Sequence, residues 1–512
     1  MTEHWDETAD VVVVGFGAAG ACAAIEAADA GARVLVLDRF GGGGATAISG
    51  GVVYAGGGTA QQREAGVTDT PQAMLDYLRE EVGDAVSAAT LLRFCEQSAD
   101  MVDWLADLGV PFDSRLCPYK TSYPTNRHYL YYSGSEQAFA HLAPPAPRGH
   151  RVYARGTSGR VLHARLAAAA RERGIRFRPR TRVERLITSP ETGRVIGVEC
   201  RTLRAGPASW AHRVLHRWSV KPGVYLPSLG RALHRPVAWL ERRYGRPVRI
   251  GAGRGVVLAA GGFVFNRAMM REHAPDYRGG LRLGTPGDDG SGIRLGLAAG
   301  GEAAHLDRVS IWRFLTPPSG MLGGRLVDRD GRHVCDETRY GAAIGEAVLR
   351  SPGGRAWLLL DGPTLKECRR QVREQTLWFQ RWQAWWLLHA GRATGPTLEA
   401  VARRAGVDPD GLTGYEGVPP YSLIDVSVRK RTAVPAPMLT LGGLRVDEET
   451  GQALGVPGLY AAGRTAVGIC SRSYVSGLSL ADCVFSGRRA GRSAANEGQH
   501  GSDRGGLHAH RG

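Results

Sequence analysis

Three glycines near the N-terminus have the spacing of a dinucleotide-binding turn. Gly15, Gly17 and Gly20 form a Gly-x-Gly-x-x-Gly pattern, and Asp38 follows them. In such a turn the first glycine allows the sharp bend, the second lets the backbone approach a pyrophosphate, and the third lets a helix pack closely on a strand. An acid at the position of Asp38 accepts hydrogen bonds from a ribose diol. The spacing therefore predicts a site for the ADP half of a dinucleotide.

The elements around the glycines are those that such a site requires. Val11 to Val14 are four valines in a row, which is typical of a buried parallel strand. The Ala-rich stretch 21–32 has high helix propensity, and Arg33 to Leu37 form a second apolar strand that ends at the acid. Ala18 and Ala19 then stand at the helix N-terminus, where free N–H groups and the helix dipole favour an anion. This order predicts a Rossmann-like βαβ unit; the alternative is such a unit without a ligand.

A second loop of small residues decides between NAD and FAD. The loop runs from Gly41 to Gly51 and includes Ala45, Thr46, Ser49 and Gly50. Such a loop can run alongside an extended cofactor, offering backbone N–H groups and hydroxyls where bulky side chains would clash. Simple NAD enzymes of the Rossmann type do not need it, so the sequence favours FAD. The alternative interpretation is a flexible linker.

Later segments add strands that end in small residues. Arg182–Leu186 and Val195–Cys200 are predicted to form two strands joined by a turn. The stretch 255–262 is an apolar strand that runs into Ala260 and Gly261, and 458–463 repeats this pattern before a last helix over about 478–495. A cofactor site assembled from both ends of the chain implies that the middle is inserted as a second domain.

The length of the chain, 512 residues, is too great for one hydrophobic core. We expect an α/β fold, with a Rossmann-like FAD-binding domain of the glutathione reductase type formed by residues 1–289 and 436–512. An inserted α+β substrate domain is expected over residues 290–435. The tail from about residue 498 is expected to be disordered.

Composition narrows the class of protein. Apolar residues make up 43% and charged residues 22%, which excludes a disordered or fibrous chain. The eight cysteines are scattered without a Cys-x-x-Cys pair, so we predict no metal site and a reducing cytoplasmic location. The N-terminus lacks the plan of a signal peptide, and no apolar run is long enough for a membrane span.

An aromatic stripe lies in the middle of the chain. Trp378, Trp382, Trp385, Trp386 and His389 recur at a spacing that places them on one helical face. Packing in the core is the favoured interpretation. Lining an apolar substrate pocket and contact with a membrane are the alternatives.

Taken together, these segments resemble the FAD-dependent flavoproteins of the fumarate reductase and 3-ketosteroid dehydrogenase superfamily. The resemblance covers nearly the whole chain and is carried by VVVVGFGAAGACAAIEAADAGARVLVLDR, ATAISGG, RGTSGRVLHARLAAAARERGIRF, GVVLAAGGF, TPGDDGSGIRLGLAAGG, PMLTLGGLRVD and GLYAAGRTAVG. Within the superfamily, LYYSGSEQAF, PPAPRGHR and SRSYVSGLSLADCVFSGRRAG look most like the 3-ketosteroid Δ4-(5α)-dehydrogenases.

The resemblance implies a set of residues that hold non-covalent FAD. The glycine turn and Asp38 would bind the ADP half, the backbone of Val183 would bind adenine, and the second loop would line the ribityl and the flavin. The full set is Gly15, Gly17, Ala18, Ala19, Gly20, Asp38, Arg39, Ala45, Thr46, Ser49, Gly50, Gly51, Val183, Ala260, Gly261, Gly463, Arg464, Gly477, Ser479 and Leu480. One departure is Arg464, because many superfamily members have glutamate there, which leaves open the ribityl contact assigned to that glutamate.

The resemblance also implies the catalytic residues. Tyr474 and Ser476 match the family's Tyr-x-Ser-Gly site, and Tyr340 matches the tyrosine that the inserted domain contributes. Backbone N–H groups near Gly477 and Leu478 would bind a substrate carbonyl oxygen, and Tyr131 and Tyr132 would border the substrate entrance.

The implied reaction is the introduction of a C=C bond next to the ketone of a 3-ketosteroid. An α-proton must leave to a base and a β-hydride to flavin N5. The tyrosine and serine hydroxyls would relay the proton, and since tyrosine titrates near 10, the pocket must either lower that pKa or share the proton among several hydroxyls. The chain contains no haem or iron–sulfur ligand pattern, so an external electron acceptor is expected.

Three other functions stay open. The first is a 3-ketosteroid Δ1-dehydrogenase or a dehydrogenase of another polycyclic ketone. The second is a fumarate-reductase-like enzyme, although Tyr-x-Ser-Gly favours a neutral ketone over a dicarboxylate. The third is a flavin-binding, membrane-docking protein without turnover.

The net charge of +16 is concentrated in one insertion. Residues 204–254 carry eleven cations against a single acid, Glu241, and their tryptophans alternate with arginines. A basic, tryptophan-bearing insertion can rest on an anionic membrane surface. We therefore expect peripheral contact with the inner face of the membrane, and lipid rather than nucleic acid as the partner; the alternative is a solvated arginine face on a packed helical hairpin.

Overall fold

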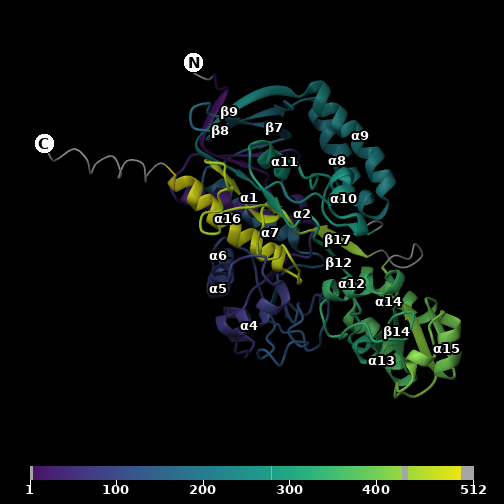
Figure 1. Ribbon diagram of the computed structural model, residues 1–512. Coiled ribbons are helices and arrows are strands. Elements are labelled where there is room, and N and C mark those ends of the chain that lie inside the picture. Colours follow the sequence, from purple (N-terminus) through teal and green to yellow (C-terminus); the bar gives the residue numbers. More distant parts are fainter. Residues whose placement is uncertain (1–3, 278–279, 429–435, 498–512) are drawn as a thin grey trace.

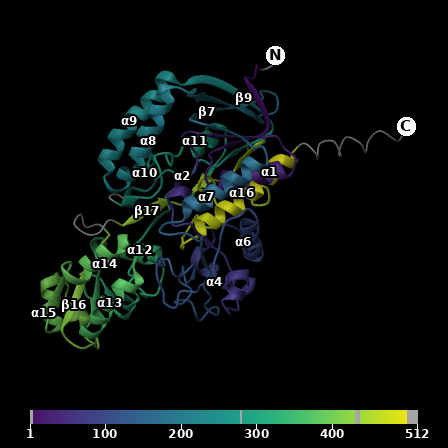
Figure 2. The same ribbon diagram turned by 180° about the vertical axis from the view of Figure 1, so that it is seen from behind.

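The structure is a computed structural model that describes residues 4–277, 280–428 and 436–497. A large domain built around a twisted sheet occupies one end of the molecule, and a smaller domain extends from the other (Figure 1). The first and last helices of the described chain lie together with α7 (Gly159–Glu172) on one face of the large domain (Figure 2).

The main sheet confirms the predicted Rossmann-like unit. Its strand order is β6-β2-β1-β9-β8-β7, and β19 also pairs with β9. Strands β1, β2, β6, β9 and β19 pair in parallel, whereas β7, β8 and β9 pair antiparallel. The strands are β1 (Glu7–Val14), β2 (Val34–Asp38), β6 (Arg176–Pro179), β7 (Thr181–Thr188), β8 (Val195–Thr202), β9 (Arg246–Leu258) and β19 (Leu459–Ala461).

Helix α1 (Ala18–Asp29) packs against α16 (Leu478–Asn496), which joins the two ends of the chain. The contact is close because small residues face each other. A Cβ atom on Gly487 would lie 2.5 Å from the Ala19 carbonyl oxygen, and one on Gly491 would lie 2.1 Å from that of Ala23. The predicted last helix is therefore confirmed, and its N-terminus is brought to the cofactor turn.

Residues 44–151 form a helical subdomain with a small three-stranded sheet, in the strand order β3-β5-β4. This sheet carries the second small-residue loop and the segment around Tyr131. The elements are α2 (Gly44–Ile48), β3 (Val52–Tyr54), α3 (Ala60–Glu64), α4 (Pro71–Val82), α5 (Ala88–Glu96), α6 (Ser98–Asp107), β4 (Leu130–Tyr131) and β5 (Gly149–Arg151).

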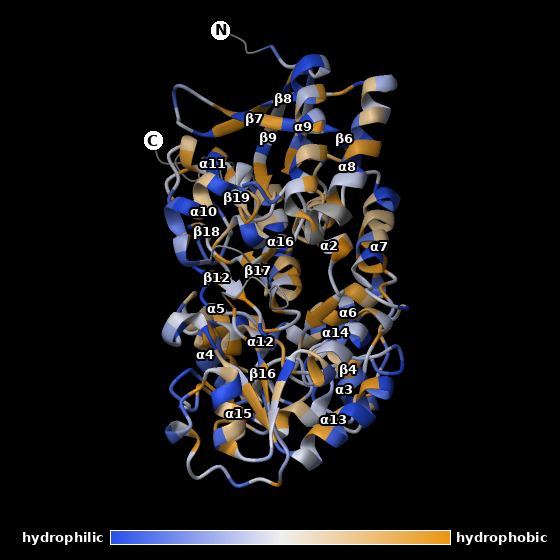
Figure 3. Ribbon diagram, turned by 90° about the vertical axis from the view of Figure 1, so that its right-hand side faces the viewer, coloured by the Kyte–Doolittle hydropathy of each residue, from blue (hydrophilic) through white to orange (hydrophobic). Residues whose placement is uncertain are grey.

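The basic insertion is a helical hairpin between β8 and β9. Its helices are α8 (Pro207–Tyr225) and α9 (Pro227–Tyr244). The hairpin lies at the edge of the main sheet, at the opposite end of the molecule from the tip of the inserted domain (Figure 3). The hairpin carries its own hydrophobic contacts through Val237 and Leu240, which are buried.

The inserted domain is built on a four-stranded sheet of order β13-β14-β16-β15. Its elements are β13 (Arg325–Val327), α12 (Gly341–Arg350), β14 (Trp357–Leu360), α13 (Gly362–Gln375), α14 (Trp378–His389), β15 (Arg392–Gly395), α15 (Leu398–Ala405) and β16 (Tyr421–Asp425). The connection to the large domain contains α10 (Arg267–His273), β10 (Leu281–Arg282), α11 (Ser291–Ala298), β11 (Ala303–Ala304), β12 (Val309–Ile311), β17 (Pro437–Thr440) and β18 (Gly443–Leu444).

Hydrophobic packing bears on the domain boundary. Ile293, Val309 and Ile311 pack in the core of the large domain, whereas apolar side chains between Leu315 and Val426 form separate cores. We therefore propose that the inserted domain begins near residue 315 rather than at residue 290. The expected tail from residue 498 lies outside the described residues.

The predicted core packing of the aromatic stripe is wrong. Trp378 is 80% exposed and Trp382 is 70% exposed, and the buried residues of α14 are Ala384 and Leu388. The helical period is correct, but the small face of the helix packs inward and the large aromatic face points to solvent.

Candidate functional site

The glycine turn admits no side chain. Gly15 has φ +104°, and a Cβ atom there would lie 2.4 Å from the carbonyl oxygen of Ala259. A Cβ atom on Gly20 would lie 1.9 Å from the carbonyl oxygen of Gly15. No room for a side chain is left between the end of β1, the glycine turn and the first turn of α1. This close packing agrees with the spacing of the three glycines.

The N-terminus of α1 keeps some of its backbone donors for a ligand. The first N–H of the helix, that of Ala18, donates to Oγ1 of Thr46 at 2.9 Å, and Gly17 provides no side-chain cap. The following N–H groups, of Ala19 and Gly20, have no intrahelical acceptor because they belong to the first turn. The structure therefore uses Thr46 to cap the helix and leaves the next two donors for an anion.

Asp38 at the end of β2 organises the turn. One carboxylate oxygen accepts from the N–H of Phe16 at 3.0 Å, and the other accepts from Phe40 at 2.8 Å and Gly42 at 3.1 Å. A carboxylate has about four lone-pair sites. The three backbone bonds leave one for a hydroxyl such as that of a ribose.

The second small-residue loop lies against α7 and closes on itself. Ser49 Oγ donates to the Thr46 carbonyl at 2.8 Å and accepts from Gly51 N at 3.1 Å. The carbonyl of Gly50 accepts from Ser158 Oγ at 2.8 Å and from the hydroxyl of Tyr123 at 2.7 Å. The hydroxyl of Ser49 is thus engaged in hydrogen bonds within the loop. Ala45 and the adjacent backbone of the loop are then the parts that could contact a cofactor.

Arg464, the residue at which the sequence departs from the superfamily pattern, forms a buried ion pair. Arg464 Nη2 lies 2.5 Å from Oδ1 of Asp288, and both side chains are almost completely buried. The pair packs on the turn after β9: a Cβ atom on Gly261 would lie 2.5 Å from the same Asp288 oxygen, and Gly262 N donates to it at 3.3 Å. The arginine is neutralised by an aspartate that sequence reasoning did not single out.

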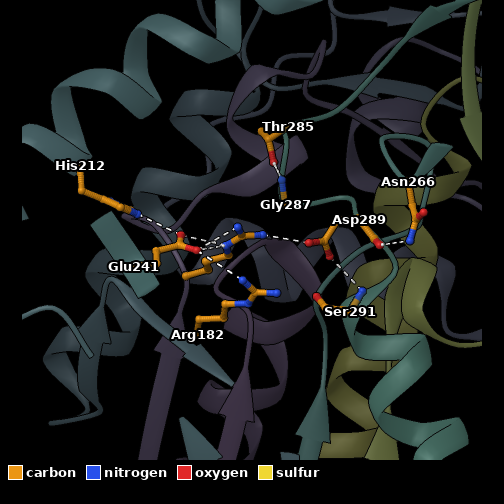
Figure 4. A network of polar contacts seen from close by, with 9 residues as sticks. Arg182, His212, Glu241, Asn266, Thr285, Gly287, Asp289 and Ser291 are labelled. Carbon is orange, nitrogen blue, oxygen red and sulfur yellow. Dashed lines mark hydrogen bonds and ion pairs between the residues drawn. The ribbon is translucent and has the colours of Figure 1, made fainter. Parts of the chain in front are cut away.

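Arg39 joins the glycine-turn region to the helical hairpin. Its guanidinium contacts Glu241 on α9 at 2.9 Å and Asp289 at 2.8 Å, and His212 on α8 contacts the same glutamate at 3.1 Å. Figure 4 shows His212 and Arg182 converging on Glu241, with Asp289 on the other side of the network. The side chain of Arg39 is therefore engaged by carboxylates of the protein, whereas Val183, next to Arg182, lies buried on β7.

Electrostatics keep Glu241 ionised inside this network. Burial acts to raise its pKa, but the hydrogen bond from His212 and the charge and hydrogen bonds of Arg39 outweigh burial and lower it to about 2. The single acid of the basic insertion is thus the anchor that fastens the hairpin to the large domain.

The N-terminus of α16 presents fewer donors than the sequence suggests. Leu478 N donates to the Val475 carbonyl at 3.1 Å, and Leu480 N donates to the Gly477 carbonyl at 3.1 Å. The first helix N–H is thus occupied by its own turn. Gly477 has φ +92°, and a Cβ atom there would meet the backbone nitrogen of Tyr54, so only glycine fits at this position. Gly477 and Ser479 are the remaining positions from which a backbone N–H can reach a ligand.

These features fit FAD. The turn accepts no Cβ atom, the first turn of α1 has free donors, and Asp38 keeps a free lone pair beside them. Gly463 brings the C-terminal segment to the same place, because a Cβ atom there would lie 2.9 Å from that of Ala19. The residues that would hold the cofactor therefore come from both ends of the chain and meet between α1 and α16.

The side chains of four hydroxyl-bearing residues gather near the start of α16, and the hydroxyls of Tyr131 and Tyr340 both interact with that of Ser476. Tyr131 OH and Ser476 Oγ are 3.1 Å apart, and the rings of Tyr340 and Tyr474 lie 6.1 Å apart. Tyr474 stacks on Trp312 at 5.3 Å, and Tyr340 packs edge-on against Phe314 at 5.7 Å. The structure thus brings the three predicted catalytic side chains together and adds Tyr131 to them.

Burial controls the protonation of these tyrosines. Desolvation raises the pKa of Tyr131, Tyr340 and Tyr474 above the ordinary value for a tyrosine. Nearby tyrosines add to the increase at Tyr340, while a hydrogen bond with Ser476 opposes it. The site therefore does not lower a tyrosine pKa, and the arrangement favours the alternative, a proton shared among several hydroxyls.

A pocket opens beside the hydroxyl cluster. Its lining includes Tyr132, Ser133, Phe314, Leu315, Tyr340 and Ile344. Tyr132 therefore lies at the pocket, as predicted for a residue of the substrate entrance, while its neighbour Tyr131 points to Ser476. Tyr131 is the last residue of the short strand β4, and Tyr132 follows it outside the strand.

Sequence reasoning missed several residues of the site. His163 Nε2 contacts the Phe16 carbonyl at 2.9 Å and so fixes the glycine turn from α7. Trp312, Phe314 and Asp288 shape the site from segments that show no motif by themselves. The tandem acids at 288–289 after a glycine were the one visible signal, since they lie within a stretch that carries the family resemblance.

Comparison with known proteins agrees with this architecture. The model of a family described as an FAD binding domain matches residues 10–477. The chain is 36% identical to a 3-oxo-5-alpha-steroid 4-dehydrogenase of Comamonas testosteroni, over 90% of this chain and 93% of that protein. It is 23% identical to a fumarate reductase (cytochrome) of Shewanella frigidimarina, over 96% of this chain and 77% of that protein.

A solved structure is similar over almost its whole length. It is the 3-ketosteroid-delta4-(5alpha)-dehydrogenase of Rhodococcus jostii RHA1 in complex with 4-androstene-3,17-dione, with a TM-score of 0.77 and 30% identity, covering 97% of this chain and 98% of that one. The fold and the site define an FAD-dependent oxidoreductase. The chain belongs to the FAD binding domain family of flavoproteins that includes steroid dehydrogenases and fumarate reductases.

Two further observations concern the described residues only. None of their helices combines the length and the apolar character needed to cross a membrane. No group of three histidine, cysteine or acidic side chains is arranged there to hold a metal ion.

Proposed function

We propose that this protein is a 3-ketosteroid Δ4-(5α)-dehydrogenase, which introduces a C=C bond next to the ketone of a saturated 3-ketosteroid. The observation that carries the proposal is the buried meeting of Tyr131, Tyr340, Tyr474 and Ser476 beside the N-terminus of α16. The similarity to two proteins named as Δ4-(5α)-type dehydrogenases supports it.

The side chains divide the work as follows. A substrate ketone next to the start of α16 would accept hydrogen bonds from backbone N–H groups near Gly477 and Ser479, which stabilise the negative charge that develops on its oxygen. The α-proton would pass to the hydroxyl oxygen of Tyr474 or Tyr340 as that hydroxyl gives its own proton to the next hydroxyl, so neither tyrosine becomes charged and one proton leaves the chain of hydroxyls to solvent water. Bound FAD supplies the acceptor for the β-hydride. Ser476 and Tyr131 would carry the proton onward through their hydrogen bond.

Burial makes this relay effective. Tyr340 and Tyr474 are almost fully buried, and Trp312 and Phe314 cover their rings. Water is thereby kept from the enolate side of the reaction, and electrostatic interactions inside the pocket are strengthened.

The alternatives differ in what the site must bind. A dicarboxylate requires cations that can bind its two carboxylates. Two buried arginines near the site are held by acids, Arg464 by Asp288 and Arg148 by Asp69. The pocket itself is lined by Lys120 and Arg339 together with the acid Glu337, so the dicarboxylate alternative is decided by the substrate test below. A Δ1-dehydrogenase uses the same ketone chemistry at another carbon pair, and the relative named 3-oxosteroid 1-dehydrogenase is 25% identical. The Δ4 reaction is preferred because of the higher identity of the Δ4-type relative.

Product identification tests the proposal. The purified holoenzyme is incubated with a saturated 5α-3-ketosteroid, a 4-ene-3-ketosteroid and succinate in turn, each with an artificial electron acceptor. We expect a 4-ene product from the first and no dye reduction with the other two. A 1-ene product would support the Δ1 reaction, dye reduction with succinate would support a dicarboxylate enzyme, and no turnover with any ketone would support a binding protein.

The partners beyond the substrate follow from the same reasoning. Reduced FAD must pass its electrons on, and we propose an external acceptor. We also propose a cytoplasmic protein whose hairpin face contacts an anionic membrane surface. Arg213, Arg217 and Trp210 are exposed on α8, and Arg235 and Trp239 are exposed on α9, whereas the one acid is buried.

Vesicle sedimentation tests the hairpin contact. We expect the wild-type holoenzyme to sediment with phosphatidylglycerol-containing vesicles at low salt and to sediment less at high salt, because screening weakens contacts between exposed charges. The Arg217→Gln, Arg235→Gln variant should sediment less. Equal binding to neutral and anionic vesicles would refute an electrostatic contact.

A further inference from the structure

Helix α14 has the arrangement of an interfacial helix rather than that of a core helix. Trp378, Phe379, Trp382, Trp385 and Trp386 are all exposed, while Ala384 and Leu388 face the interior. The helix thus attaches to the inserted domain by its small face. The solvent-facing side of the helix carries these five aromatic side chains together with Arg381, Gln383 and His389.

Ring contacts connect three of the exposed side chains of α14, Trp382, Trp385 and His389, and a separate contact joins Trp378 to Phe379. Trp382 stacks on Trp385 with ring centroids 5.3 Å apart, and Trp385 stacks on His389 at 5.1 Å. A contiguous exposed apolar patch marks an interaction site. Tryptophan combines a large apolar ring with an N–H donor, which suits the boundary between acyl chains and headgroups. The chemistry of the patch therefore fits a bilayer surface.

The position of α14 links this surface to the pocket. Gln380 Nε2 donates to the carbonyl of Tyr123 at 3.5 Å, and the adjacent Ser122 bonds to the Thr316 carbonyl at 2.7 Å. Ser122 and Thr316 line the pocket beside Tyr340. The first turn of α14 is thus connected, through Tyr123 and Ser122, to residues that line the pocket.

Charge identifies the occupant. Arg373 and Arg381 are exposed around the start of α14. Helices α8, α9 and α14 lie toward the same side of the molecule (Figures 1 and 3), and α8 and α9 carry exposed arginines and tryptophans. Two copies of this chain meeting through such faces would bring like charges together. An anionic lipid surface instead complements the cations and receives the tryptophans.

We propose that α14 inserts its tryptophan face into the headgroup region of an anionic bilayer and so places the mouth of the substrate pocket on the membrane. The hairpin then supplies a second, electrostatic contact. This inference rests on the proposed function only for the benefit of such contact: a sterol-like ketone dissolved in the bilayer would enter the pocket directly from the membrane.

The experiment uses the full-length, FAD-loaded protein and steroid-free vesicles of phosphatidylcholine with phosphatidylglycerol. Partitioning is measured by co-sedimentation, and insertion by the blue shift of tryptophan fluorescence and its quenching by lipids with a spin label on the acyl chain. The test variant is Trp382→Gln, Trp386→Gln. The matched control is Leu297→Gln, Val418→Gln, which removes two exposed apolar side chains from other surfaces.

We expect the tryptophan variant to partition about tenfold more weakly at both low and high salt, because burial of apolar rings is not screened by ions. The control should partition like the wild type, and both should keep their FAD absorbance and melting temperature. Wild-type fluorescence should be quenched by the labelled lipids, and that quenching should be clearly weaker in the variant.

Other results would overturn the proposal. The first is equal partitioning of the wild type and the tryptophan variant. The second is a variant that binds vesicles as the wild type does but no longer self-associates, as measured by light scattering; that result would assign the face to a second copy of the chain. Since no steroid is present, failure here leaves the proposed dehydrogenation intact. A protein that oxidises no steroid could still show the binding.

Discussion

The hydroxyl of Tyr131 lies 3.1 Å from Oγ of Ser476, although 345 positions separate the two residues in the chain. A second bond, from Ser133 Oγ to the Ser476 carbonyl at 3.2 Å, holds the same segments together. The strand β4 of the helical subdomain therefore supports the start of α16 directly. It also extends the hydroxyl cluster beyond the three side chains that sequence motifs indicate.

Removing the Tyr131 hydroxyl should slow turnover without loss of the cofactor. We expect Tyr131→Phe to lower kcat about 10- to 100-fold, since one member of the proton relay is lost, and Tyr474→Phe to lower it about 1000-fold. FAD absorbance should be unchanged in both. Tyr129→Phe, whose hydroxyl bonds to the Ala154 carbonyl away from the cluster, is the control. Wild-type turnover by Tyr474→Phe would remove that residue from the mechanism.

A methyl group at Gly15 should prevent FAD binding. The backbone has φ +104°, and the added Cβ atom would meet a main-chain carbonyl at 2.4 Å, so neither conformation nor space allows it. We expect Gly15→Ala to be purified without the flavin band or to be insoluble. Gly41→Ala has open space at its Cβ and an ordinary φ, and it should bind FAD normally. Equal FAD content in the two variants, measured by absorbance, would contradict the packing argument.

Breaking the buried pair between Arg464 and Asp288 should destabilise the holoenzyme strongly. Arg464→Met leaves an unpaired carboxylate in the interior, which costs about 3–5 kcal/mol in comparable cases. The double variant Asp288→Asn, Arg464→Met removes both charges and should recover part of the loss. Denaturant unfolding with FAD in excess measures both. A double variant less stable than Arg464→Met would show that the pair is not the cause.

Acid should loosen the hairpin from the large domain. Burial, followed by nearby positive charge, lowers the pKa of His216 to about 3 and that of His234 to about 4. The unfolded chain binds protons on these imidazoles below about pH 6.5 while the folded chain does not. Their contribution to stability is therefore present above pH 6.5 and is lost as the pH falls toward 4.

The measurement is the melting temperature of the holoenzyme between pH 7 and pH 5. We expect the free energy of unfolding to fall by about 2 kcal/mol for each of the two histidines over this range, and to fall less in the His216→Phe, His234→Leu variant. His141→Gln changes an exposed histidine and is the control. A variant with the same pH dependence as the wild type would exclude the two histidines as its source.

Patterns of local origin were predicted correctly because their cause is local. Four valines, three glycines and an alanine-rich stretch fix a strand, a turn and a helix by sterics and propensity alone. The helical period of α14 was likewise correct. The prediction of which face of α14 points inward was wrong, because the buried face depends on the shape of the surface against which the helix packs.

The residues of the site show the same division. The glycine turn, Asp38 and the Tyr-x-Ser-Gly stretch carry their spacing in the sequence. Asp288 and His163 lie in segments that carry the family resemblance, and Trp312 lies outside them, but the roles of all three arise from contacts between distant parts of the chain. The occupied N–H of Leu478 could not be predicted either, since it depends on how the turn from Val475 closes.

The sequence by itself determined the cofactor turn, the strand, helix and strand that surround it along the chain, and the basic character of the hairpin. Each of these depends on residues that are neighbours in the sequence. Only the tertiary structure decided that the single acid of the hairpin is its anchor on Arg39, that Tyr131 joins Ser476, and that the tryptophans of α14 face outward. These outcomes depend on which surfaces meet, and burial and pairing are set by the whole fold rather than by any one segment.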